Sequence, residues 1–117
     1  MAIPSKHRLT GAKQYATVFK EVRPISSEHL ALRVRRIRES QNTRFGVTVS
    51  VKLAPKAVLR NAVRRSVSEV VRRVVSRRDI PDGSIAVFSV KKLPLPNAAT
   101  LHAEVVSLLQ KSAILVR

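Results

Sequence analysis

The sequence predicts a small α+β sandwich with elements in the order helix, strand, strand, helix, strand, helix, in which helices pack on a mixed sheet. Three segments carry apolar residues at the three-and-four spacing of amphipathic helices, and two others alternate apolar and polar residues as half-buried strands do. The chain has 117 residues and is 44% hydrophobic, as expected of one globular domain. We expect a single domain over residues 1–117, with flexible tails at 1–8 and 114–117.

The first half of the chain predicts one helix and two strands. Residues 9–20 place apolar and aromatic side chains on one helical face, and Pro24 with two serines predicts a turn over residues 22–27. Alternation from Leu30 to Val34 predicts a strand that either bulges near Arg36 or ends there. A second alternation covers residues 45–52. Because the connection is short, we expect these two strands to pair as an antiparallel hairpin.

The second half predicts a long helix, a buried strand and a last helix. Pro55 suits a first helical turn, and no Gly or Pro interrupts residues 56–79, which gives about 35 Å of helix. Residues 84–90 are apolar on both alternating faces, as expected of a central strand. Asn97 is a good N-cap for the last helix. The apolar stripe of the long helix consists of Val58, Leu59, Ala62, Val63, Val67, Val70, Val71 and Val74, and that of the last helix of Leu101, Val105, Leu108 and Leu109.

The charge balance points to a polyanionic partner. The chain carries 23 Lys and Arg against 7 Asp and Glu, a formal net charge of +16, and nucleic acid is the partner that most readily relieves such repulsion. The absence of cysteine excludes a disulfide scaffold, a thiol nucleophile and a Cys-ligated zinc site. Neither an apolar run of bilayer length nor a signal-peptide centre is present, so we expect a cytoplasmic protein without membrane contact.

The long helix concentrates the positive charge. Eight basic residues lie between Lys56 and Arg78, against the single acid Glu69. Steps of four place one row along a helical flank: Lys56, Arg60, Arg64, Ser68 and Arg72, with Asn61 and Arg65 beside it. Like charges at this spacing repel one another. Phosphates would neutralise these positive charges, and the planar guanidinium group of arginine binds a phosphate with two hydrogen bonds. The alternative is an ordinary solvated polar face.

The polar face of the two alternating strands forms a second candidate site. It offers Arg33, Arg35, Thr48, Ser50 and Lys52, next to the start of the basic helix. Together, sheet floor and helix flank would make a groove that suits an extended single strand of nucleic acid. Tyr15 or Phe19 would add base stacking if the first helix lines the other wall. The alternative for both rings is a place in the core.

Catalysis by the chain itself finds little support. His7, His29 and His102 are scattered without metal-binding spacing. The seven acids show no paired arrangement for acid–base work, and the three glycines form no phosphate loop. We expect neither a catalytic residue nor a protein metal site.

Residues 45–65, FGVTVSVKLAPKAVLRNAVRR, resemble the signature of the bacterial ribonuclease P protein subunit. The residues on the family pattern are Gly46, Val49, Ser50, Lys52, Ala57, Val58, Arg60, Asn61, Arg64 and Arg65. The opening Arg8, Leu9, Tyr15, Val18 and Phe19 and the ending Leu108, Leu109, Lys111 and Ser112 extend the resemblance over nearly the whole chain. Two positions depart from it. Ala62 replaces the central arginine of the Arg-Asn-Arg motif, and Val51 replaces the first lysine of a pair.

The resemblance implies a subunit of an endoribonuclease that binds a catalytic RNA and assists removal of the 5′ leader from precursor tRNA, while the RNA does the chemistry. It also implies a left-handed strand–helix–strand crossover, against the usual right-handed rule. Mg²⁺ would be held by the RNA and the substrate. The expected partners are the RNA subunit and precursor tRNA, with no obligate protein partner.

Combined with the basic flank and the sheet floor, the resemblance divides the candidate residues into two groups. The expected RNA-subunit contacts are Arg60, Asn61, Arg64, Arg65 and Arg72. The expected contacts to the leader and precursor tRNA are Tyr15, Phe19, Arg33, Arg35, Thr48, Ser50, Lys52 and Lys56. Composition alone supports a non-catalytic ribosomal or nucleoid protein equally well, and only the motif separates the two. A third hypothesis, a self-sufficient nuclease, would have to use the scattered histidines.

Overall fold

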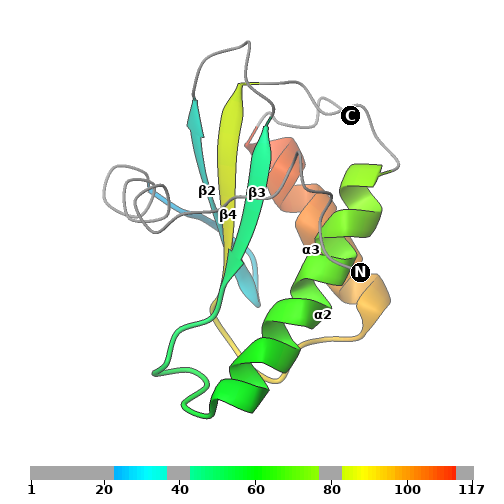
Figure 1. Cartoon of the computed structure of the whole chain (residues 1–117). Coiled ribbons are helices and arrows are strands. Elements are labelled where there is room, and N and C mark those ends of the chain that lie inside the picture. Colours follow the sequence, from blue (N-terminus) through cyan, green and yellow to red (C-terminus); the bar gives the residue numbers. More distant parts are fainter. Residues whose placement is uncertain (1–22, 37–42, 77–82, 113–117) are drawn as a thin grey trace.

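The computed structural model describes residues 23–36, 43–76 and 83–112, and in them two helices pack against a four-stranded mixed sheet (Figure 1). The elements are β1 (Ile25–Ser26), β2 (Leu30–Arg36), β3 (Arg44–Thr48), α2 (Ala57–Ser76), β4 (Ser84–Val90) and α3 (Ala98–Lys111). The predicted α+β class is confirmed. The helix predicted over residues 9–20 and the predicted tails lie outside the described residues.

Strand β4 lies in the middle of the sheet, whose order is β1-β2-β4-β3. It pairs antiparallel with β2, with Leu32 opposite Phe88, and parallel with β3, with Phe45 opposite Ala86. The predicted central strand is therefore confirmed, but the predicted hairpin of β2 with β3 is wrong. A strand that is apolar on both faces is typical of the interior of a sheet, where both faces are buried and both edges pair with other strands. β4 takes this place by inserting between β2 and β3.

Helix α2 connects two parallel neighbours, β3 and β4, because parallel strands require a crossover rather than a tight turn. The left-handedness of this crossover stays a prediction. The starts of the two strands are joined by Thr43, whose hydroxyl oxygen accepts a hydrogen bond from the Ser84 N–H at 3.2 Å. Gly83 enters β4 with φ of 98°, a left-handed conformation that glycine adopts without steric cost.

The core lies between one face of the sheet and the two helices. Leu30, Leu32 and Phe88 point from the sheet into it and are fully buried. Val67, Val71, Val74, Val105, Leu108 and Leu109 meet them from α2 and α3. Burying each such side chain contributes roughly 1.5 to 3 kcal/mol. This packing stabilises a helix whose many β-branched residues lower its intrinsic propensity.

The first turns of α2 extend past the ends of the strands (Figure 1). Val58 is 84% exposed and Leu59 46% exposed, Ala62 is also exposed, and the first buried residue of the helix is Val63. The predicted apolar stripe is therefore wrong over its first three members. They lie in the first turns of α2, before the helix reaches the buried core. An apolar side chain is buried only where another surface packs against it.

Strand β3 ends four residues earlier than the alternation predicts. Ser50 closes a turn instead: its Oγ accepts from the Leu53 N–H at 3.1 Å and its carbonyl oxygen from the Ala54 N–H at 3.0 Å. Val51 is consequently 63% exposed. Alternation cannot distinguish such a turn from a strand, because the serine side chain competes locally for backbone hydrogen bonds.

The remaining elements follow the predictions more closely. β2 reaches Arg36, where the sequence predicts an end or a bulge, and residue 37 lies outside the described residues. The predicted turn before β2 contains the two-residue strand β1, too short to show any alternation. The predicted N-cap of α3 is confirmed, since the Asn97 side chain accepts from the Thr100 N–H at 2.8 Å. Neither described helix is long and apolar enough to cross a bilayer.

Candidate nucleic-acid interface

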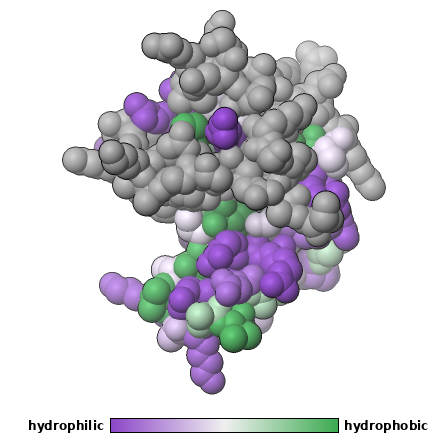
Figure 2. Space-filling model, viewed as in Figure 1, coloured by the Kyte–Doolittle hydropathy of each residue, from purple (hydrophilic) through white to green (hydrophobic). Residues whose placement is uncertain are grey.

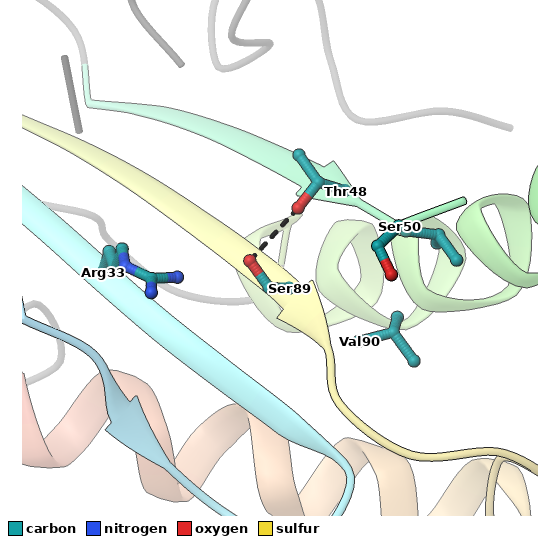
Figure 3. Close-up of a pocket in the computed structure, with 6 residues that line it drawn as sticks. Arg33, Thr48, Ser50, Ser89 and Val90 are labelled. Carbon is teal, nitrogen blue, oxygen red and sulfur yellow. Dashed lines mark hydrogen bonds between the residues drawn. The ribbon is translucent and has the colours of Figure 1, made fainter. Parts of the chain in front are cut away.

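A cavity of about 300 Å³ opens on the sheet (Figure 3). It is lined by Arg33, Thr48, Val49, Ser50, Ser89 and Val90. Successive side chains of a strand point to opposite faces, so Arg33, next to buried Leu32, points away from α2 and α3. Three predicted leader-binding residues thus come together: Arg33 from β2, Thr48 from the end of β3 and Ser50 from the turn after it.

Two hydroxyl groups lie side by side in this cavity. Thr48 and Ser89 are opposite one another in the parallel pair of β3 and β4, and their Oγ atoms are 3.1 Å apart. Each hydroxyl has one proton to donate and two lone pairs, so the pair retains capacity to bind a further polar group. Sequence reasoning missed Ser89 because it lies in a strand dominated by apolar residues. The available signal was that it is the one polar residue within the interior of that strand.

The other predicted leader-binding residues lie outside the cavity lining. Arg35 follows Arg33 on the same face of β2, and Lys52 and Lys56 are exposed in the segment between β3 and α2. Tyr15 and Phe19 lie outside the described residues. The predicted groove between the sheet floor and the flank of α2 is wrong, because α2 packs on the opposite face of the sheet and contributes no residue to this cavity.

The exposed side of α2 carries a polar, positively charged surface. Asn61, Arg64 and Arg65 are exposed there, and neither of the two arginines has an acidic partner among the described residues. We call these three residues the α2 basic patch. Figure 2 shows hydrophilic side chains gathered over the region where α2 runs in Figure 1, bordered by hydrophobic ones.

The other two predicted RNA-subunit contacts are engaged within the protein. Arg72 holds both carboxylate oxygens of Glu69, with its Nη2 2.5 Å from Oε1 and its Nε 3.3 Å from Oε2. Arg73 Nε adds an ion pair at 3.6 Å. The Arg72 hydrogen bond holds the pKa of Glu69 well below its usual range. Arg60 turns towards the segment before the helix, where its Nη1 donates to the carbonyl oxygens of Ala54 at 3.0 Å and Pro55 at 2.9 Å.

The family model described as Ribonuclease P matches residues 3–113. The chain belongs to the ribonuclease P protein family. The ribonuclease P protein component of Rippkaea orientalis (strain PCC 8801 / RF-1) is 30% identical over 95 residues, which cover 78% of this chain and 73% of the relative. That of Synechocystis sp. (strain ATCC 27184 / PCC 6803 / Kazusa) is 32% identical over 71 residues, so the chain spans 57% of that relative's length.

The fold is that of solved ribonuclease P proteins. The RNase P protein of Thermotoga maritima matches with a TM-score of 0.72 and 25% identity, over 89% of this chain and 96% of that protein. The Staphylococcus aureus RNase P protein also matches with a TM-score of 0.72, at 18% identity, over 92% of this chain and 96% of that one. The predicted family is therefore confirmed.

The histidines of this chain form no catalytic constellation in the residues described. His29 is buried and its ring contacts the Glu104 carboxylate, which also binds the Ser27 hydroxyl, so the carboxylate separates the serine from the imidazole. His102 is half-buried beside a different cavity, and His7 lies outside the described residues. Across residues 23–36, 43–76 and 83–112, no three His, Asp or Glu side chains gather as a metal site.

Proposed function

We propose that this chain is the protein subunit of ribonuclease P. It binds the catalytic RNA subunit through the α2 basic patch and the 5′ leader of precursor tRNA in the cavity on the sheet. One observation carries the proposal. This chain, which belongs to the ribonuclease P protein family, has two separate surfaces with groups that can bind phosphate: one on α2 and one on the sheet face that α2 does not cover.

The α2 basic patch supports binding to a folded RNA. Arg64 and Arg65 present planar guanidinium groups that bind phosphate with two hydrogen bonds each, and the Asn61 amide adds a donor and an acceptor. A formal charge of +16 supplies long-range attraction to any polyphosphate. Such contacts fix position and orientation rather than read a sequence.

The cavity on the sheet supports binding to an unpaired strand. Arg33 supplies a positive charge, and the hydroxyls of Thr48 and Ser89 can exchange hydrogen bonds with phosphate oxygens or with a ribose 2′-hydroxyl. Lys52 and Lys56 add positive charge on the segment that leads from the cavity to α2. These groups contact features common to all nucleotides, which suits leaders of varied sequence.

The chemistry is assigned to the RNA subunit. The described residues offer no cluster of carboxylates or imidazoles that fits a Mg²⁺ ion, so Mg²⁺ is assigned to phosphate oxygens of the RNA and the substrate. The protein contributes positioning of the substrate and neutralisation of phosphate repulsion. We propose that it acts on precursor tRNA in the cytoplasm, without an obligate protein partner.

Reconstitution tests the proposal. The full chain is mixed with ribonuclease P RNA at low Mg²⁺ concentration, and cleavage of precursor tRNA is followed, with the Arg64→Ala/Arg65→Ala double variant as the control. We expect the wild-type chain to stimulate cleavage and the variant to stimulate it less at equal concentration. No stimulation would favour a ribosomal or nucleoid binding protein. Cleavage by the protein without any RNA subunit would favour a self-sufficient nuclease.

A further inference from the structure

Arg60 lies between the two proposed RNA surfaces, at the start of α2. We propose that it is a positioning residue, which shapes the segment over residues 50–56 for leader binding and does not itself bind a phosphate of the RNA subunit. This inference rests on the proposed function of the cavity. The segment is called the 50–56 loop below.

One residue supplies hydrogen bonds to three consecutive carbonyl groups. The Arg60 guanidinium donates to the carbonyl oxygens of Ala54 and Pro55 at 3.0 and 2.9 Å, and the Arg60 backbone N–H donates to that of Lys56 at 3.0 Å. Helical side chains lean towards the N-terminus of their helix, so a long side chain in the first turn reaches back over the preceding loop. Arg60 therefore joins the loop to the helix.

The 50–56 loop carries groups of the proposed leader site. Ser50 lines the cavity at one end of the loop, and Lys52 and Lys56 are exposed along it. The Ser50 turn holds the first end, and the fully buried Ala54 anchors the middle. Arg60 holds the second end. If it were removed, the carbonyl groups of Ala54 and Pro55 would lose their donor, and the distances from the cavity to the two lysines would no longer be fixed.

The same two hydrogen bonds argue against a direct phosphate contact. A hydrogen bond with a charged donor is roughly twice as strong as one between neutral groups, and Arg60 Nη1 makes two of them. Both N–H groups of this nitrogen are engaged, so binding a phosphate oxygen through it would require breaking at least one of these hydrogen bonds. Arg64, one helical turn further along, is exposed and has no acidic partner among the described residues, so it binds phosphate without such a cost.

The experiment compares Arg60→Ala with Arg64→Ala, which removes the same charge one turn away. Two quantities are measured with the full chain and ribonuclease P RNA. One is the slope of log affinity for the RNA subunit against log salt concentration. The other is the ratio of holoenzyme affinities for precursor tRNA with a leader and for mature tRNA. We expect Arg64→Ala to reduce the magnitude of the slope by about 0.7 to 0.9, the value of one lost phosphate contact, and to keep the ratio. We expect Arg60→Ala to keep the slope and to lower the ratio several-fold.

A loop variant separates positioning from charge. Pro55→Gly loosens the 50–56 loop without changing charge, and because Pro55 is exposed it removes little packing. It should lower the leader ratio and keep the slope, as Arg60→Ala does. Arg60→Lys keeps the positive charge and an ammonium group with three N–H donors, so it should restore part of the ratio of affinities for precursor and mature tRNA. If Arg60→Ala fails to fold in a thermal melt, Pro55→Gly and Arg60→Lys carry the test.

Two results would overturn the inference. One is a loss of slope in Arg60→Ala equal to that in Arg64→Ala, which would establish a direct phosphate contact. The other is an unchanged leader ratio in both Arg60→Ala and Pro55→Gly. Failure of the proposed function is distinguishable from both, because the wild-type holoenzyme would then bind precursor and mature tRNA equally.

Discussion

The Glu104 carboxylate in α3 accepts hydrogen bonds from the backbone N–H of His29 at 2.9 Å and from its ring Nδ1 at 2.8 Å. The Ser27 hydroxyl adds a third at 2.5 Å. These contacts join α3 to the turn between β1 and β2. Although partial burial raises the pKa of Glu104, the hydrogen bonds from Ser27 and His29 outweigh it and hold that pKa below its ordinary value.

This network makes stability depend on acidity. Because the folded pKa of Glu104 lies below the unfolded value, about 4.3 for a glutamate, its contribution is present at neutral pH and is lost as pH falls through the folded pKa. We expect Glu104→Gln to lower the free energy of unfolding by roughly 1 to 3 kcal/mol at pH 7, and by less below about pH 4. Urea denaturation at several pH values measures both.

Glu28→Gln is the matched control for the acid-stability experiment. Glu28 contacts the other ring nitrogen of His29 at 3.2 Å, but its side chain is 69% exposed, so its replacement should change stability little. A difference between wild type and Glu104→Gln that stays constant down to pH 3 would contradict the pKa direction.

Removing Glu69 should strengthen RNA binding. Glu69 is the only acid in α2, it stays ionised at neutral pH, and it holds Arg72 and Arg73. We expect Glu69→Gln to release both arginines, raise affinity for the RNA subunit and steepen its salt dependence. Glu28→Gln, the same charge change outside the helix, controls for net charge. Weaker binding in Glu69→Gln would mean that the ion pairs hold the arginines in their binding orientation.

The hydroxyl pair in the cavity should matter only when a leader is present. Thr48→Val and Ser89→Ala each remove one hydroxyl with little change of shape. We expect each to weaken holoenzyme binding of precursor tRNA by roughly 0.5 to 1.5 kcal/mol and to leave binding of mature tRNA unchanged. Ser66→Ala, which removes an exposed hydroxyl bonded to the Ala62 carbonyl oxygen, is the control. Equal losses of affinity for precursor and mature tRNA would show that these hydroxyls do not contact the leader.

Arginine substitutions along α2 test the burial pattern of the helix. Ala62→Arg and Val58→Arg should fold normally because both positions are exposed, and Ala62→Arg should bind the RNA subunit more tightly by restoring a cation to the motif. Val63→Arg should unfold or nearly unfold the protein, because it buries an unpaired charge at a site only 7% exposed. Thermal melts and filter binding measure both effects. Normal melting of Val63→Arg would show that the helix is rotated about its axis.

Salt should weaken RNA binding steeply. If about six to ten phosphates are neutralised, affinity for the RNA subunit should fall by roughly three to five decades between 50 and 200 mM salt. A titration of the reconstituted complex measures the slope. A flat response would contradict binding through phosphates.

Local periodicity was enough to determine much of this fold from the sequence. The apolar face of α3, the Asn97 cap and the central, doubly covered β4 were predicted, because each depends on residues within a few positions of one another. The family motif likewise lies within one short stretch, residues 45–65. Side-chain alternation within a strand is enough to predict that Arg33 and Thr48 lie on the polar face of the sheet, whereas Ser50 reaches the cavity from a turn that alternation does not describe.

Tertiary structure alone decided how these elements combine. The insertion of β4 between β2 and β3 brings Ser89 to Thr48 across 41 residues of sequence, and Glu104 reaches His29 across 75. The turn of Arg60 towards Ala54 and the exposure of Val58 likewise depend on where α2 meets the sheet. Periodicity specifies which face of an element is apolar. Which partner covers that face, and for how much of its length, is decided by the packing of all elements into one core.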